Sequence, residues 1–307
     1  MLERNTEVEA KLRELAFLEQ QLAEQTVDDT ATRIRKAQTD FAAFIEFVMK
    51  DELTGEGVTL APIHRTWIEH LTFCWSNGLH SCVLAPFGHG KTAIFSVALP
   101  LWLMGVDPSL RIKLYSANDE TAKERVSLVR QYIDGSNEYH RVFPHVKPSE
   151  TEQWTSHKLY IARDTMAKDA TLQALGALSS GIGGRCDIMI LDDLNDAKNC
   201  LHQPRLREQI NRHYRAVYMS RLDRRHGLVA MIATRWHDKD LVGTILADNE
   251  ARSSYGFLIQ RIDQDMTAIQ CEYLMGVGRE RGIVTRLDQL LDQYERGYFD
   301  TGIDDPH

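Results

Sequence analysis

The residues best suited to chemistry lie in a short loop between two apolar segments. The segment before it, residues 81–85, is typical of a buried strand, and the segment after it, residues 93–103, is typical of a helix. Glycines in such a loop allow positive φ and let backbone N–H groups and a helix N-terminus approach a polyphosphate. The sequence therefore predicts a nucleotide-binding loop made of Pro86, Phe87, Gly88, His89, Gly90, Lys91 and Thr92.

Two side chains of this loop have defined roles in nucleotide chemistry. Lys91 is expected to reach the β- and γ-phosphates of ATP, and the hydroxyl of Thr92 is expected to hold Mg²⁺. The loop departs from the pattern G-x-x-x-x-G-K-[ST], because Ala85 stands where the first glycine is expected. The strand, the helix and the Gly-Lys-Thr core remain, which favours phosphate binding over a chance surface turn.

A second motif places two carboxylates at the end of an apolar strand. Residues 188–191 are all apolar, as in a strand buried on both faces of a parallel sheet, and Asp192 and Asp193 follow them. The carboxyl ends of such strands line the ligand-binding crevice. Asp192 is expected to hold Mg²⁺ through water, and Asp193 is the expected catalytic residue that orients and polarises the attacking water.

Other residues are candidates for nucleotide contacts. The apolar strand at residues 228–233 ends in Thr234, which would lie beside the same crevice and sense the γ-phosphate. His64 and Arg65, upstream of the phosphate loop, are candidates for contacting the adenine; the alternative is ordinary polarity at a helix start.

Composition limits the classes of partner. The net charge of −8 gives no overall attraction to nucleic acid, so any DNA contact must come from a local patch. Such a patch, or else a solvated helix face or a subunit contact, is indicated by Arg205, Arg207, Arg212, Arg215, Arg221, Arg224 and Arg225.

We expect neither a secretion signal nor a membrane-spanning segment in this chain. Its five cysteines are odd in number and have no C-x-x-C spacing, which favours reduced thiols. No apolar run reaches membrane-spanning length, and the N-terminus is too charged for a signal peptide. We expect a cytoplasmic protein with no membrane partner.

Three motifs in this order resemble one known family. Ala-Pro-x-Gly-His-Gly-Lys-Thr, Leu-Asp-Asp and Ala-Thr-Arg-Trp-His are similar to the ATPase domain of the large terminase subunit, the DNA-packaging motor of tailed bacteriophages, over about residues 40–300. The resemblance implies an α/β P-loop NTPase fold (ASCE, RecA-like) with a mostly parallel central sheet flanked by helices. It also implies ATP-driven translocation of double-stranded DNA into a procapsid in the host cytoplasm, by a homo-oligomeric ring that works with a portal protein and a small terminase subunit.

The resemblance also assigns roles to residues. Lys91 and Thr92 belong to the Walker A loop, Asp192 to Walker B and Thr234 to the coupling motif, while Asp193 stands at the catalytic carboxylate, often Glu in the family. Phe87 occupies a position where the family often carries arginine. A charge-stabilising arginine must therefore come from elsewhere, in the same chain or a neighbouring one; Arg185 is our first candidate and Arg235 the second.

The expected domain organisation has three parts. Residues 1–39 form an N-terminal helical arm and linker, residues 40–254 the P-loop ATPase core, and residues 255–307 a small lid subdomain and tail. The arm would either dock on a partner or pack on its own domain. Fewer than fifty residues follow the last ATPase strand and they lack a strand-rich pattern, so we expect no nuclease domain.

Two other functions are compatible with the motifs. One is a helicase-like DNA-dependent ATPase, although a monomeric helicase normally needs two such cores and a single phosphate loop is visible. The other is a nucleotide-dependent assembly module that binds ATP and hydrolyses little. Asp193 favours an enzyme, and the missing loop arginine favours the module.

Overall fold

A computed structural model describes residues 29–86, 88–165, 167–179, 183–260 and 272–275. Its centre is an eight-stranded sheet with the strand order β3-β4-β2-β5-β6-β1-β7-β8. The strands from β4 to β7 in this order are all parallel, and β3 and β8 pair antiparallel at the two edges. The strands are β1 (His80–Leu84), β2 (Ile112–Ser116), β3 (Lys158–Leu159), β4 (Leu172–Gly176), β5 (Ile188–Asp192), β6 (Leu228–Ala233), β7 (Tyr255–Ile259) and β8 (Glu272–Met275).

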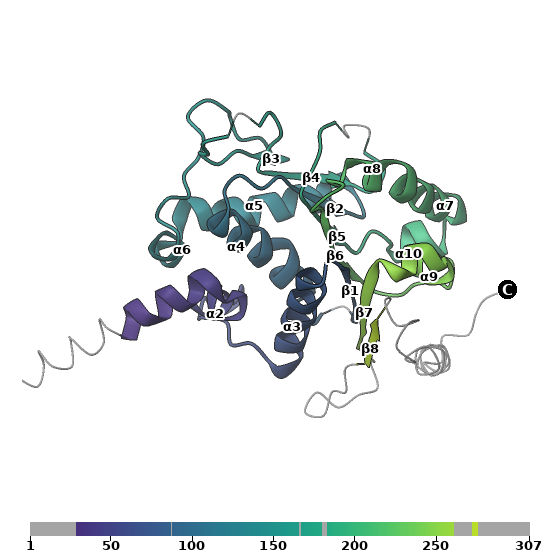
Figure 1. Ribbon diagram of the computed structural model, residues 1–307, viewed down its shortest axis with the longest axis horizontal. Coiled ribbons are helices and arrows are strands. Elements are labelled where there is room, and N and C mark those ends of the chain that lie inside the picture. Colours follow the sequence, from purple (N-terminus) through teal and green to yellow (C-terminus); the bar gives the residue numbers. More distant parts are fainter. Residues whose placement is uncertain (1–28, 87, 166, 180–182, 261–271, 276–307) are drawn as a thin grey trace, which may run out of the picture.

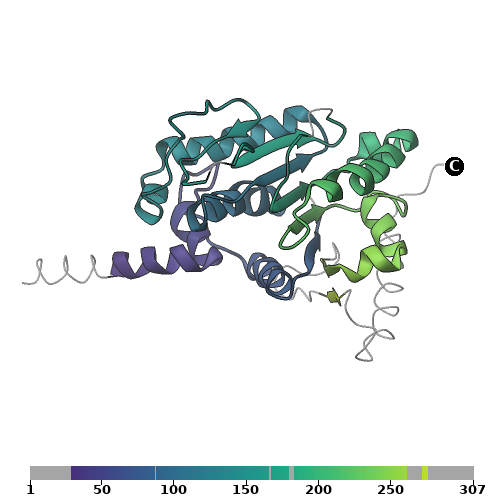
Figure 2. The same ribbon diagram turned by 45° about the horizontal axis from the view of Figure 1, so that its top comes forward.

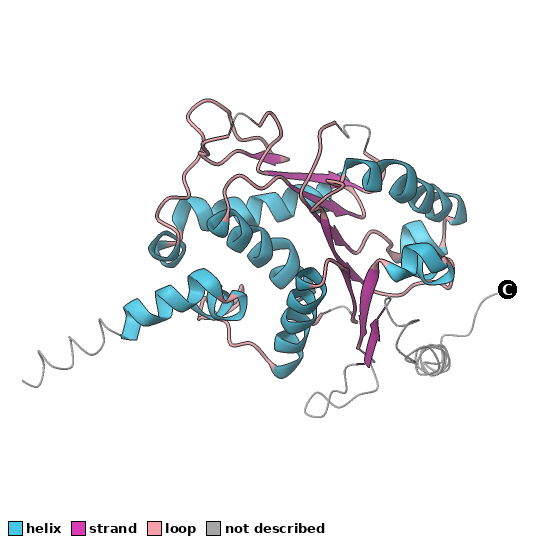
Figure 3. Cartoon of the chain, viewed as in Figure 1, coloured by secondary structure: helices cyan, strands magenta, loops and turns pink. Residues whose placement is uncertain are grey.

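Helices cover both faces of this sheet, as Figures 1 and 3 show. The first group, preceded by a helical segment at residues 29–39, comprises α2 (Phe41–Val48), α3 (Pro62–Ser76), the π-helical η1 (Ala93–Ala98), α4 (Leu99–Val106), α5 (Asp119–Gly135) and α6 (Asn137–Val142). The second group, on the opposite face, comprises η2 (Ala197–Leu201), α7 (Pro204–His213), η3 (Tyr214–Tyr218), α8 (Met219–Arg221), α9 (Leu241–Ala247) and α10 (Asn249–Ser253). The two groups of helices are also separate in the turned view of Figure 2.

The central strands are mostly apolar because both faces of the sheet are buried there. Along β5, Ile188 and Ile190 enter the core shared with α2 to α6, whereas Met189 and Leu191 enter the core shared with α7 to α9. The other central strands alternate in the same way. This period of two decides the face of every strand-end residue, including Asp192, which falls on the side of η1 and α5.

The strand order confirms the predicted fold class. Strand β6 lies between β1, which leads into the phosphate loop, and β5, which ends in the two aspartates. An extra strand between these two is what the ASCE type of P-loop fold has. Because the three strands are parallel, the phosphate loop, the aspartates and Thr234 all follow their strands at the same edge of the sheet.

Helix α5 shows how the sequence positions one element beside this edge. Asn118 caps the helix by accepting a hydrogen bond from the Thr121 backbone N–H (2.9 Å). This cap lies two residues after Ser116, the last residue of β2, which pairs in register with Asp192. Its buried residues Ala122, Val126, Val129 and Ile133 have helical spacing. The helix therefore begins at the edge that carries the motifs and packs along the sheet.

The described residues change one predicted boundary. Strand β7 pairs in parallel with β1, so residues 255–259 belong to the central sheet and not to a separate lid. Apart from Gln260 and β8, the rest of the predicted lid and tail lies outside the described residues, as does the N-terminal arm up to residue 28.

Two further expectations can be compared with the described part of the chain. Four of the five cysteines lie there, and all four are buried and free, as expected for reduced thiols. None of the helices in this part is both long enough and apolar enough to cross a membrane.

Candidate functional site

The phosphate loop has the backbone conformation that its glycines allow. Gly88 and Gly90 have φ values of 80° and 74°, in the left-handed region that glycine enters without strain. Both are exposed, and Pro86 and His89 are partly buried. Phe87 lies outside the described residues. The loop therefore presents an open backbone at the start of the helix that begins at Lys91.

Lys91 turns its side chain back into the protein. Its Nζ donates hydrogen bonds to the Ala85 carbonyl (2.6 Å) and to Thr234 Oγ1 (2.5 Å), and lies 3.5 Å from Asp193 Oδ2. The side chain is 4% exposed, and this burial lowers the pKa of the ammonium group, against the opposing effect of Asp193 and Asp192. Lys91 thus already joins the phosphate loop to the two other motifs.

Thr92 and Asp192 form the pair that suits a magnesium ion. The Thr92 hydroxyl donates to Asp192 Oδ1 at 3.4 Å. The described residues contain no group of three or more His, Cys, Asp or Glu that could hold a metal by themselves. Mg²⁺ is usually held by one or two protein oxygens, several waters and substrate phosphates, so this donor set fits it.

Asp193 adopts a conformation that is rare for its residue type. Its φ is 44°, and it is the one non-glycine residue with positive φ in the described part of the chain. Its Oδ1 accepts from the Thr234 backbone N–H (2.7 Å), and its own N–H donates to the Ile232 carbonyl (2.9 Å). Burial raises the pKa of its carboxyl group, with Lys91 acting against that effect. Such backbone outliers cluster at functional sites.

Thr234 connects all three motifs. Its hydroxyl accepts from Lys91 Nζ and lies 3.3 Å from the Ala85 carbonyl, to which it donates. Its backbone N–H binds Asp193. Lys91, Thr92, Asp192, Asp193 and Thr234 are therefore brought together.

His64 supports the loop rather than pointing to a base. Its Nε2 lies 3.1 Å from the His89 carbonyl, and its Nδ1 accepts from the Ala61 backbone N–H at 3.3 Å. Burial lowers the pKa of this ring. Arg65 pairs with Glu46 at 2.5 Å. Both ring nitrogens of His64 have backbone partners, so the geometry favours a role in holding the phosphate loop over the predicted adenine contact.

The structure separates Arg185 from the site of its own chain. The adjacent Cys186 pairs with Leu222 ahead of β6, and the Asp187 backbone N–H donates to the Arg111 carbonyl (2.8 Å) ahead of β2, so Arg185 lies at the opposite edge of the sheet. It precedes Asp192 by seven residues, which at about 3.3 Å per residue corresponds to roughly 20 Å. Arg185 therefore cannot supply charge to this site in the same chain.

Arg235, the second candidate, is engaged in an ion pair. Its Nε donates to Asp240 Oδ2 at 2.9 Å, and its side chain is 10% exposed. Asp240 also caps α9 by accepting from the Gly243 N–H (2.8 Å). The pair therefore orders the segment between β6 and α9, next to Thr234.

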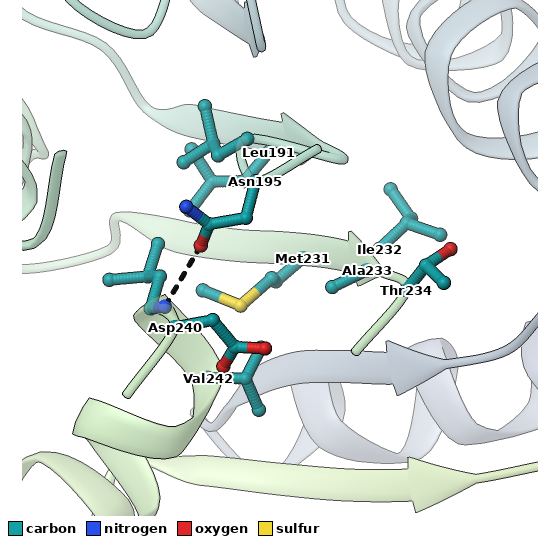
Figure 4. A pocket seen from close by; sticks show the side chains of 10 residues that line it. Leu191, Asn195, Met231, Ile232, Ala233, Thr234, Asp240 and Val242 are labelled. Carbon is teal, nitrogen blue, oxygen red and sulfur yellow. Dashed lines mark hydrogen bonds between the residues drawn. The ribbon is translucent and has the colours of Figure 1, made fainter. Parts of the chain in front are cut away.

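A small pocket lies next to this segment, between the ends of β5 and β6 and the start of α9 (Figure 4). Its lining comes from β5, β6 and the start of α9, and Asn195 Oδ1 accepts there from the Leu241 backbone N–H at 2.9 Å. Together with the Asp193–Thr234 bond, this contact ties the segment after β5 to the segment after β6 at two points.

One charged residue of the site was missed by the sequence analysis. Arg125, on α5, donates from Nε to Asp192 Oδ2 at 3.3 Å. A signal for it exists in the sequence, because Arg125 stands three residues after Ala122 and one before Val126, on the apolar face of the helix.

The basic stripe is interrupted in the structure. Arg207 is buried and donates to the Cys200 carbonyl at 2.8 Å, so it serves packing. Arg215 pairs with Asp248 at 3.3 Å. Arg215 is nevertheless exposed, and so are Arg205 and Arg212 on α7.

The sheet order and the phosphate loop define an α/β protein with a P-loop nucleotide-binding fold. No protein-family model matches the sequence, and no curated protein is significantly similar to it. Among solved structures, the large terminase of bacteriophage HK97 is similar, with a TM-score of 0.51 and 17% sequence identity. The match covers 74% of this chain and 45% of that terminase. The predicted likeness to a large terminase ATPase domain is thereby confirmed at the level of the fold.

Proposed function

We propose that this chain is a Mg²⁺-dependent ATPase and the motor portion of a viral DNA-packaging machine. The observation that carries the proposal is the meeting of Lys91, Asp193 and Thr234 at one edge of the sheet, with Thr92 and Asp192 beside them. These are the donors, the acid and the metal pair that phosphoryl transfer to water requires.

Each group of residues in this site has a separate role in the proposed reaction. The backbone of residues 88–90 receives the phosphates, and Lys91 exchanges its contacts with Ala85 and Thr234 for the β- and γ-phosphates. Asp193, held by the Thr234 N–H, orients the attacking water and accepts its proton. When bound through Thr92 and Asp192, Mg²⁺ neutralises charge that develops on the phosphates.

ATP hydrolysis by Asp193→Asn tests the proposal. Asparagine tolerates left-handed φ, so the variant keeps the turn after β5, and loss of the acid is expected to lower turnover by about 10²-fold or more. ATP binding should persist. Lys91→Ala gives the blank, since it removes the charge that meets the phosphates.

The outcome separates the proposed functions. An ATPase that stalls in Asp193→Asn supports the motor, whereas a wild-type rate no higher than that of Lys91→Ala contradicts it and favours the ATP-binding assembly module. A rate per subunit that rises with protein concentration supports a homo-oligomeric ring whose site is completed by a neighbour. In such a ring, Arg185 of one subunit could face the site of the next.

We further propose double-stranded DNA as the substrate of translocation, with a portal protein and a small terminase subunit as partners in the host cytoplasm. The likeness to the HK97 large terminase supports this assignment. Exposed Arg205 and Arg212 on α7 are the candidate phosphate contacts.

Salt dependence tests the DNA contact. Replacing Arg205 and Arg212 by alanine should weaken binding to any duplex alike and reduce the slope of log K against log salt by about 2. Arg130→Ala, an exposed arginine on α5 across the sheet, is the control. An unchanged slope in the double variant would place the DNA elsewhere.

A further inference from the structure

Arg125 occupies an unusual place for an arginine. It lies on the face of α5 that packs on the sheet, among the buried residues Ala122, Val126 and Val129. Its side chain is 20% exposed. A guanidinium group in such surroundings is costly unless a carboxylate compensates its charge.

Asp192 supplies this compensation. Its side chain is 2% exposed, and its Oδ2 accepts from Arg125 Nε at 3.3 Å. The other acidic neighbour, Glu124, is 63% exposed and lies 3.7 Å from a terminal nitrogen of Arg125. Solvent screens that outer contact, so the pair with Asp192 is the stronger one.

The two oxygens of Asp192 face different partners. Oδ1 lies 3.4 Å from the Thr92 hydroxyl, on the side where the metal pair is formed, and Oδ2 faces Arg125. A carboxylate held through one oxygen keeps a defined orientation, so the bond to Arg125 presents Oδ1 to Thr92. Hydrogen bonds of this kind, from outside a metal site, orient its ligands.

The fold fixes Arg125 firmly in this position. Ser116, at the end of β2, pairs in register with Asp192, and α5 starts three residues later under the cap of Asn118. Asp119 then accepts from the Gly176 backbone N–H at 2.8 Å, which ties the first turn of α5 to the end of β4.

We propose that Arg125 is a positioning residue that orients Asp192 for Mg²⁺ and thereby sets the metal affinity of the nucleotide site in the same chain. The inference rests on the proposed ATPase function and adds a residue to it that none of the three motifs contains.

The test measures binding of ATPγS, by calorimetry, at increasing Mg²⁺ concentration. In Arg125→Gln the half-saturating Mg²⁺ concentration should rise about 10-fold or more, while ATPγS affinity in EDTA stays that of the wild type. Arg125→Lys should recover part of the loss. Arg130→Gln on the same helix, whose partner Asp134 is half exposed, should leave both values unchanged.

A second comparison shows whether Arg125 acts through Asp192. In an Asp192→Asn background, Arg125→Gln should cause no further change, because the oriented oxygen is already lost. Denaturant unfolding of each variant identifies any that does not fold; if Arg125→Gln is one of these, Arg125→Lys carries the test. A folded Arg125 variant with wild-type Mg²⁺ dependence overturns the inference. A wild type that binds no ATPγS with Mg²⁺ overturns the proposed function itself.

Discussion

Gly90 of the phosphate loop has room for a side chain but a positive φ that residues other than glycine rarely adopt. A Cβ atom added at Gly90 would meet only His64 Nε2, at 3.8 Å, which is ordinary contact. The cost of Gly90→Ala to folding is therefore that of its positive φ, about 1–2 kcal/mol. Its effect on function is expected to be larger, because the methyl group would stand where the phosphates approach the backbone.

We predict that Gly90→Ala lowers nucleotide affinity by at least about 10-fold, which corresponds to 1.4 kcal/mol of binding free energy. Gly78→Ala is the matched control: its φ is 69° and a Cβ there has no neighbour within 4 Å, but it lies in the turn between α3 and β1. The two variants should lose similar stability in urea, and Gly78→Ala should bind nucleotide normally. Wild-type affinity in Gly90→Ala would mean that phosphates do not approach this backbone.

At the scale of elements, the segment from Thr234 to α9 depends on one carboxylate. Asp240 caps α9 and pairs with the largely buried side chain of Arg235, and its Oδ2 also accepts from the Trp236 N–H at 3.2 Å. Asp248 also caps a helix, α10, and pairs with an arginine, but its partner Arg215 is half exposed.

These two caps should differ strongly in their contribution to stability. We predict that Asp240→Ala lowers the free energy of unfolding by about 3 kcal/mol, because the largely buried guanidinium of Arg235 loses its carboxylate partner. Asp248→Ala should cost about 1 kcal/mol, the usual value of a helix cap. Urea denaturation measures both. Equal losses would show that the Arg235–Asp240 pair contributes little to the order of the segment.

At the scale of the whole molecule, the buried His70 and the half-buried His80 make stability depend on pH. Burial lowers the pKa values of His70 and His80 to about 4. Their neutral forms are thus favoured in the folded chain, and unfolding takes up protons below the ordinary value of 6.5. Stability is full above pH 6.5 and is lost as pH falls toward 4, by up to about 3 kcal/mol for each residue.

We predict that urea midpoints stay constant from pH 8 to pH 7 and fall steadily between pH 6.5 and pH 4. His80→Phe should reduce this slope, because it removes one of the groups that charge on unfolding. A variant with an unchanged slope would show that His80 is protonated in the folded protein at the same pH as in the unfolded chain.

Local sequence was sufficient to predict the fold class and the edge of the sheet that carries the motifs. Gly90-Lys91-Thr92 after an apolar strand, and Asp192-Asp193 after another, identified the edge of the sheet where the site lies, because apolar runs and glycine loops act within a few residues. The predicted fold class followed from the same alternation of strands and helices.

Contacts between distant segments were set by tertiary packing alone. Arg185 precedes Asp192 by seven residues and lies at the opposite sheet edge, whereas Arg125 is 67 residues away and touches it. The register between β2 and β5 brings α5 to Asp192, and no local pattern encodes that register. Likewise, Arg207 looked like part of a charged surface until packing buried it. Strand pairing and helix packing join residues by position in the fold, and so they determine which charges meet.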